Sequence, residues 1–137
     1  ERAKLKAIEK YSLPVGIAFQ LVDDVLGIFG NVKITGKSNE SDIKEGKKTL
    51  LFTKAVGLVD KNERRFLSRW YGSRKATKAD IKKIKDIIRR SGAVEASFSH
   101  AEELIRKGKQ NIKNMTDMPL YQKILGSLAD YTISRKR

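Results

Sequence analysis

Apolar residues recur along the chain at steps of three and four positions, and no segment alternates convincingly with a period of two. This spacing predicts helices almost throughout and therefore an all-α fold. Residues 15–29 are almost continuously apolar, which is typical of a central helix buried on most sides. Pro14 suits the first turn of that helix, and Gly30-Asn31 suits its end.

The segment that follows the central helix has a different character. From residue 30 to about residue 48 the chain is polar and punctuated by glycines. This connection exceeds the roughly 12 to 15 residues beyond which a loop without regular structure is uncommon, and such loops are often functional.

Beyond this loop, apolar residues at helical spacing predict outer helices over residues 49–59, 62–71, 79–90, 93–112 and 120–133. In the helix at 79–90 the expected core stripe consists of Ile81, Ile84, Ile87 and Ile88. In the last helix it consists of Ile124, Leu125, Leu128 and Tyr131. Each stripe needs a partner to bury it, so we expect these helices to pack around a shared core.

Composition narrows the class of protein only slightly. With 137 residues and no cysteine, the chain has the length of one domain and no thiolate metal site. The net charge of +14 fits an anionic partner, but basic runs such as 74–90 are more often simply the solvated faces of helices. Neither a nucleic-acid motif nor an array of stacking aromatics accompanies the lysines, so we expect no nucleic-acid partner.

The two ends of the chain carry little targeting information. Residues 1–6 open directly into a charged amphipathic pattern without a signal-peptide core, and no stretch reads as a membrane span. We therefore expect a cytoplasmic protein with no integral membrane segment. Because the chain opens within a helical pattern, without an initiator Met or a cap, we also expect it to be cut from something longer.

Two adjacent carboxylates carry the strongest chemical signal. The only polar side chains within residues 15–29 are Gln20, Asp23 and Asp24, which fall on one stripe together with Gly16 and Gly27. A single buried polar residue can be satisfied by a neighbour, but adjacent carboxylates in apolar surroundings persist as anions only beside cations or strong donors. Mg²⁺ takes oxygen ligands and is often shared between carboxylates and substrate phosphates. The pattern therefore predicts Asp23 and Asp24 as magnesium ligands.

The following loop adds cations and a further carboxylate, namely Lys37, Asp42, Lys47 and Lys48. Beside a carboxylate helix, these lysines would supply counter-charges for a diphosphate, although each taken alone is equally compatible with a solvated loop. Gly36-Lys37-Ser38 is not a P-loop, because the first glycine is missing at the required spacing and no strand precedes it.

Taken together, residues 16–27, Gly36-Lys37, Asp42 and residues 45–50 closely resemble the second aspartate-rich region of the trans-polyprenyl diphosphate synthases, and most closely that of archaeal-type geranylgeranyl diphosphate synthases. The resemblance implies the helical isoprenoid-synthase fold, with residues 1–137 as the C-terminal portion of one synthase domain. Within it, residues 15–29 would be the second aspartate-motif helix, 30–48 the diphosphate-binding loop and 49–137 the outer helices.

The resemblance also implies roles for individual residues. Asp23 and Asp24 would face the magnesium cluster, Asp23 more directly. Gln20 would line the pocket of the allylic substrate, and Lys37 and Lys47 would hold its diphosphate.

Further roles follow from the same comparison. Asp42 would support the loop and the metal cluster, and Lys48, adjacent to the family's lysine, is a weaker candidate for diphosphate binding. Arg135 and Arg137 resemble a basic terminus that closes over the diphosphate of the other substrate.

The implied reaction begins when an allylic diphosphate ionises and negative charge builds on the leaving group, where Mg²⁺ and lysines stabilise it. The double bond of isopentenyl diphosphate then attacks the allylic cation, and loss of a proton completes the elongation. This chemistry needs no side-chain nucleophile. The implied partners are the two diphosphate substrates and either a second copy of the chain, as a homodimer, or the missing N-terminal part.

Three departures from the family pattern bear on function. Gly27 stands where many members carry a third aspartate, and Glu40 stands where glycine is usual. The first aspartate-rich motif is absent from the 137 residues, so we expect the chain to be inactive by itself. Two hypotheses follow: the chain is part of a complete prenyltransferase, or it is a non-catalytic partner of a heteromeric prenyl synthase.

Overall fold

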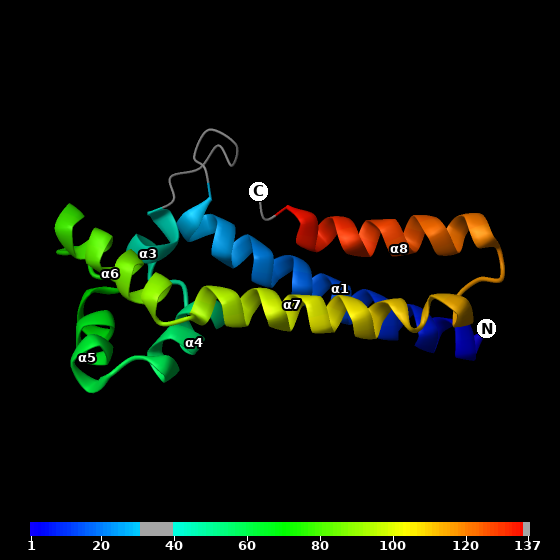
Figure 1. Ribbon diagram of the computed structural model, residues 1–137, viewed down its shortest axis with the longest axis horizontal. Coiled ribbons are helices and arrows are strands. Elements are labelled where there is room, and N and C mark those ends of the chain that lie inside the picture. Colours follow the sequence, from blue (N-terminus) through cyan, green and yellow to red (C-terminus); the bar gives the residue numbers. More distant parts are fainter. Residues whose placement is uncertain (31–39, 136–137) are drawn as a thin grey trace. The chain divides into compact units, whose positions relative to one another are not determined.

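The computed structural model describes residues 1–30 and 40–135, and every regular element in these ranges is a helix. In chain order they are α1 (Arg2–Phe29), α3 (Ser41–Glu45), α4 (Leu50–Leu58), α5 (Lys61–Trp70), α6 (Lys78–Arg90), α7 (Ala93–Lys109), the short 3-10 helix η1 (Ile112–Asn114) and α8 (Pro119–Ser134). The predicted all-α fold is confirmed. Figure 1 shows these helices coloured along the sequence. The chain divides into two compact units, Glu1–Val22 with Phe98–Arg137 and Asp23–Ser97, so that α1 and α7 each contribute to both.

The first unit is built from the early part of α1, the later part of α7, η1 and α8. α7 passes close to α1 at Gly108, where an added Cβ would lie 3.0 Å from the Val15 Cγ2 atom and 3.1 Å from the carbonyl oxygen of Tyr11. The Tyr11 hydroxyl in turn donates to the carbonyl oxygen of Leu125 on α8 at 2.7 Å. Lys109 and Asp130 join α7 to α8 through an ion pair of 2.7 Å. These contacts join α1, α7 and α8 within this unit.

The central helix begins earlier than predicted, at Arg2, and Pro14 lies inside it rather than in its first turn. Proline removes one helical hydrogen bond, the one to the Lys10 carbonyl. Many of the residues before it are good helix formers, so the helix continues through. The expected burial on most sides holds only for the last turns, because Ile17 and Phe19 are 42% and 44% exposed.

The last predicted helix is present, but its expected core stripe is wrong. Ile124, Leu128 and Tyr131 are more than half exposed. The buried positions of α8 are Ala129 and Thr132, one residue further along on the adjacent face. Small side chains at these positions allow helices to approach closely. A prediction based on large apolar residues does not find such positions.

The second unit contains the last turns of α1, the first turn of α7 and helices α3 to α6. The predicted stripe of α6 is confirmed, since its four isoleucines are at most 2% exposed. Other fully buried side chains of this unit are Ile28, Ile43, Leu51 and Leu67. This unit therefore has an aliphatic core of its own, which positions the last turns of α1 and the short helix α3.

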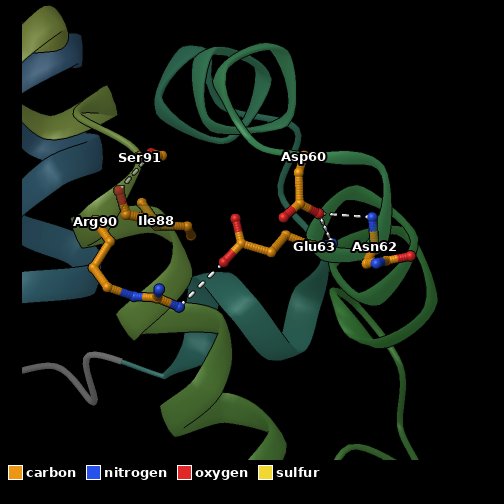
Figure 2. Close-up of polar contacts among 6 residues, drawn as sticks. All are labelled: Asp60, Asn62, Glu63, Ile88, Arg90 and Ser91. Carbon is orange, nitrogen blue, oxygen red and sulfur yellow. Dashed lines mark hydrogen bonds and ion pairs between the residues drawn. The ribbon is translucent and has the colours of Figure 1, made fainter.

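Polar contacts define the ends of α5 and α6 (Figure 2). The Asp60 carboxylate caps α5 by accepting the backbone N–H groups of Asn62 and Glu63 at 2.7 and 2.9 Å. The Glu63 carboxylate pairs with Arg90 at the end of α6, at 3.1 Å. The Ser91 hydroxyl then donates to the carbonyl oxygen of Ile88 at 2.7 Å and closes the last turn of α6.

By length and composition alone, α1 is able to cross a membrane, which differs from the expectation that no stretch reads as a span. The same test is passed by core helices of soluble proteins, so it is weak support for a membrane location. The two carboxylates near the end of α1 would also be costly in a lipid environment.

Candidate substrate and metal site

The last two turns of α1 place the predicted metal ligands in the second unit. Val25 and Ile28 are 3% and 1% exposed and fix this end of the helix in the apolar core. Asp24 is 9% exposed, whereas Asp23 is partly exposed. Both carboxylates make interactions within the protein. The helix thus presents one buried and one accessible carboxylate at adjacent positions.

Asp42 supplies a third carboxylate from the short helix α3. Its side chain lies against Gly27, one turn after Asp23 on α1. A Cβ at position 27 would stand 2.5 Å from the Asp42 Oδ2 atom and 3.4 Å from its Cγ atom. Such an approach leaves no room for a side chain at position 27 while Asp42 stays in place. Gly27 therefore provides the notch that the Asp42 carboxylate fills.

Lys47 joins this group through Asp42. Its Nζ atom lies 2.5 Å from the Asp42 Oδ1 atom and 3.4 Å from a carboxylate oxygen of Glu45. The hydrogen bond with Asp42 raises the pKa of the Lys47 ammonium above its usual value, so the group stays cationic at neutral pH. The Lys47 side chain is 51% exposed and that of Asp42 only 15%. A half-exposed cation held by a partly buried carboxylate is well suited to meet an anionic ligand from solution.

Sequence reasoning missed the turn after α5, which contacts the backbone of this loop. The Tyr71 hydroxyl donates to the Lys47 carbonyl oxygen at 2.8 Å, and the Gly72 N–H donates to the Ile43 carbonyl oxygen at 2.8 Å. Burial, together with the nearby carboxylates of Asp42 and Asp24, raises the pKa of the Tyr71 hydroxyl well above its usual value, so it remains a donor. Nothing in the local sequence around 70–73 distinguishes this turn from an ordinary helix end.

Glu40, the departure from the usual glycine, starts α3. Its carboxylate pairs with Lys44 at 2.8 Å, four residues later. The hydrogen bond with Lys44 lowers the pKa of the Glu40 carboxyl below its usual value. The extra negative charge at position 40 is thus compensated within α3 itself.

The other predicted site residues are Gln20, Lys37, Lys48, Arg135 and Arg137. Gln20 belongs to the first unit and is exposed there, and Lys48 is exposed in the second. Lys37 and Arg137 lie outside the described residues. The Arg135 guanidinium lies 4.0 Å from the centre of the Phe19 ring in the first unit. The roles of these residues stay predictions.

The carboxylates of the second unit are the kind of ligand that Mg²⁺ prefers, but in the part of the chain that the structure describes too few of them converge to hold the ion by themselves. Carboxylate oxygens are the ligands this ion prefers, and it commonly keeps waters and substrate phosphates in the rest of its octahedral shell. In residues 1–30 and 40–135, no three carboxylate, imidazole or thiol side chains converge closely enough to hold an ion by themselves. Asp23 and Asp24 would therefore need ligands from a diphosphate, water or another part of the enzyme.

Comparison with known proteins defines the class. The sequence profile of the polyprenyl synthetase family matches residues 1–88, which is more than half of the chain. The chain belongs to the polyprenyl synthetase family.

Individual relatives agree with this assignment. A geranylgeranyl diphosphate synthase of Saccharolobus solfataricus is 36% identical over 138 aligned residues, which cover 97% of this chain and 40% of the relative. A (2E,6E)-farnesyl diphosphate synthase of Mycobacterium bovis is 32% identical, with 98% of this chain and 38% of the relative covered. The chain thus spans about 40% of the length of the relatives it matches.

Solved structures share the fold. A polyprenyl synthase from Caulobacter crescentus, complexed with calcium and isoprenyl diphosphate, matches the whole chain with a TM-score of 0.89 and 33% identity, over 42% of its own length. A geranylgeranyl pyrophosphate synthase from Corynebacterium glutamicum, complexed with isoprenyl diphosphate and magnesium, matches 96% of the chain with a TM-score of 0.86 and 30% identity, over 37% of its length. The helical isoprenoid-synthase fold predicted from the sequence is confirmed.

Proposed function

We propose that the complete protein carrying this chain is a cytoplasmic, magnesium-dependent prenyltransferase that joins isopentenyl diphosphate to an allylic diphosphate. The observation that carries the proposal is the cluster at the end of α1. The Asp42 carboxylate fills the notch at Gly27, one turn from Asp23, and binds the ammonium group of Lys47. Carboxylates for a metal and a cation for a diphosphate are thereby gathered in one compact unit.

In this proposal the chain's own residues bind and orient the departing diphosphate. Lys47 exchanges part of its ion pair with Asp42 for an oxygen of the allylic diphosphate and stabilises the negative charge that builds there. Asp23 and Asp24 would hold Mg²⁺, which would add to the stabilisation of that charge. Gln20 and Lys37 complete the allylic site, as the resemblance to the family implies.

The chain contributes only part of the active site. The family's other magnesium ligands belong to the first aspartate-rich motif, which the 137 residues do not contain. We therefore propose that this chain is inactive by itself. It would act only together with the missing N-terminal part or with a complete subunit.

The test is condensation of radiolabelled isopentenyl diphosphate with geranyl and farnesyl diphosphates by the complete protein, with Mg²⁺ and after its removal by a chelator. We expect prenyl products only when the metal is present. Absence of products from every allylic substrate would contradict the proposal. Products that form only after a second, complete synthase subunit is added would support the non-catalytic partner instead.

A further inference from the structure

Hydrogen bonds to the backbone N–H and C=O groups of Lys47 hold the loop that carries this residue. The Lys47 N–H donates to the Asp42 carbonyl oxygen at 3.1 Å. The Lys47 carbonyl oxygen accepts the Thr49 N–H and the Tyr71 hydroxyl, each at 2.8 Å. The Tyr71 bond comes from 24 residues away, so among these three bonds it ties the loop to another part of the unit.

The Tyr71 ring is itself immobilised. It stacks on Phe52 in the first turn of α4, with ring centroids 3.9 Å apart and planes inclined by 20°. The start of α4 is fixed by Thr49, whose hydroxyl accepts the Phe52 N–H at 3.2 Å. Since Thr49 follows Lys47 by two residues, the ring, the helix cap and the lysine form one connected group.

A second contact lies directly beside the first. Gly46 and Gly72 have φ angles of +67° and +79°, a conformation that favours glycine. A Cβ on either residue would lie 2.8 Å from the Cα atom of the other. The Gly72 N–H also donates to the Ile43 carbonyl oxygen, the last turn of α3. Two glycine backbones therefore touch immediately before Lys47 and immediately after Tyr71.

We propose that the Tyr71-Gly72 turn is a positioning element, which holds the Lys47 backbone so that its ammonium group meets the diphosphate. This inference rests on the function proposed above for Lys47. Tyr71 contacts no substrate in this account and acts only through Lys47. The energetic reason is entropic, because a lysine on a fixed backbone loses less conformational freedom on binding an anion than one on a loose loop.

The test is a double-mutant cycle in the complete protein. Tyr71→Phe removes the hydroxyl and keeps the stacked ring, and we expect kcat/KM for the allylic diphosphate to fall about fivefold to tenfold, while KM for isopentenyl diphosphate is unchanged. The melting temperature should drop by no more than about 2 to 4 °C, the size expected for one hydrogen bond. In the Lys47→Ala background the same change should alter kcat/KM by less than about twofold, because residues that act as a unit are not additive.

Tyr121→Phe is the matched control, since Tyr121 is 49% exposed on α8 in the other unit. It should leave both constants unchanged. Wild-type kinetics in Tyr71→Phe, or a full loss that recurs in the Lys47→Ala background, would overturn the inference.

Calorimetric binding of magnesium inorganic diphosphate to the same variants gives a readout without turnover. We expect Tyr71→Phe to weaken binding about fivefold only when Lys47 is present. If the wild-type protein binds diphosphate with this pattern but condenses no substrate, the proposed function fails and the positioning role stands. If the wild type turns over and the effects are additive, the positioning role fails alone. No diphosphate binding by the wild type would overturn both.

Discussion

At the scale of single residues, the contact between Gly27 and Asp42 gives the prediction that is most directly testable. We expect Gly27→Ala to displace the Asp42 carboxylate, since the added Cβ would lie 2.5 Å from its Oδ2 atom. The end of a flexible side chain moves easily, and alanine favours the helix by up to about 1 kcal/mol, so the melting temperature should hold or rise. Turnover should fall by roughly tenfold, because a displaced Asp42 carboxylate no longer holds the Lys47 ammonium group that stabilises the developing charge.

Gly57→Ala is the control for this change. Gly57 also lies in a helix of the second unit, α4, but an added Cβ would meet nothing within 4 Å. It should give the same helix stabilisation with unchanged turnover. A Gly27→Ala enzyme of full activity would show that the notch has no functional role.

The sequence alone names the charged residues of the candidate site but not the groups that hold them. The stripe of polar residues in an apolar helix was enough to single out Asp23 and Asp24, and the resemblance added Asp42 and Lys47. Tyr71 could not be found in this way. Its contact with Lys47 joins residues 24 positions apart, and a hydrogen bond to a backbone carbonyl leaves no trace in the spacing of residue types.

At the scale of elements, the Asp60 cap of α5 can be tested. Asp60→Ala removes the acceptor for two backbone N–H groups, which typically costs about 1 kcal/mol. We expect amide hydrogen exchange in the first turn of α5 to become roughly fivefold faster. Asp60→Asn keeps an acceptor oxygen and should exchange like the wild type. Equal acceleration in both variants would mean that the lost charge, and not the lost acceptor, weakens the helix.

Helix positions were predictable because apolar periodicity reports which face is buried. The predicted helices at 49–59, 62–71 and 79–90 correspond closely to α4, α5 and α6. The helix predicted over 93–112 ends earlier, at Lys109, and continues as η1. A lone proline is typical of a helix start, so the sequence does not predict the turns of α1 before Pro14, and the five residues of α3 are too few to show a period.

At the scale of the whole molecule, exposed apolar side chains predict how the isolated 137-residue chain behaves. On α1 they are Leu5, Ile8, Leu13, Ile17 and Phe19, and on α8 they include Leu120, Ile124, Leu128 and Tyr131. Apolar faces of this extent favour association. We expect the isolated chain to self-associate in light scattering and to show no condensation of isopentenyl diphosphate with any allylic diphosphate. A monodisperse monomer with a cooperative calorimetric transition, or turnover by the pure chain, would contradict this expectation.

The central claim is that Asp23 binds a metal that holds the diphosphate and is not needed for folding. The variant Asp23→Asn in the complete protein tests this claim most directly. The change nearly conserves side-chain volume, and it relieves repulsion between adjacent carboxylates, so metal-free stability should be unchanged or higher. Loss of one metal contact at the departing charge should cost on the order of 3 kcal/mol, which lowers turnover about a hundredfold or more. Turnover and melting temperature should be measured with and without Mg²⁺ and a diphosphate analogue. The account predicts lost turnover, an unchanged metal-free melting temperature and a smaller stabilisation by metal with analogue. Wild-type turnover, or a large loss of metal-free stability, would contradict it.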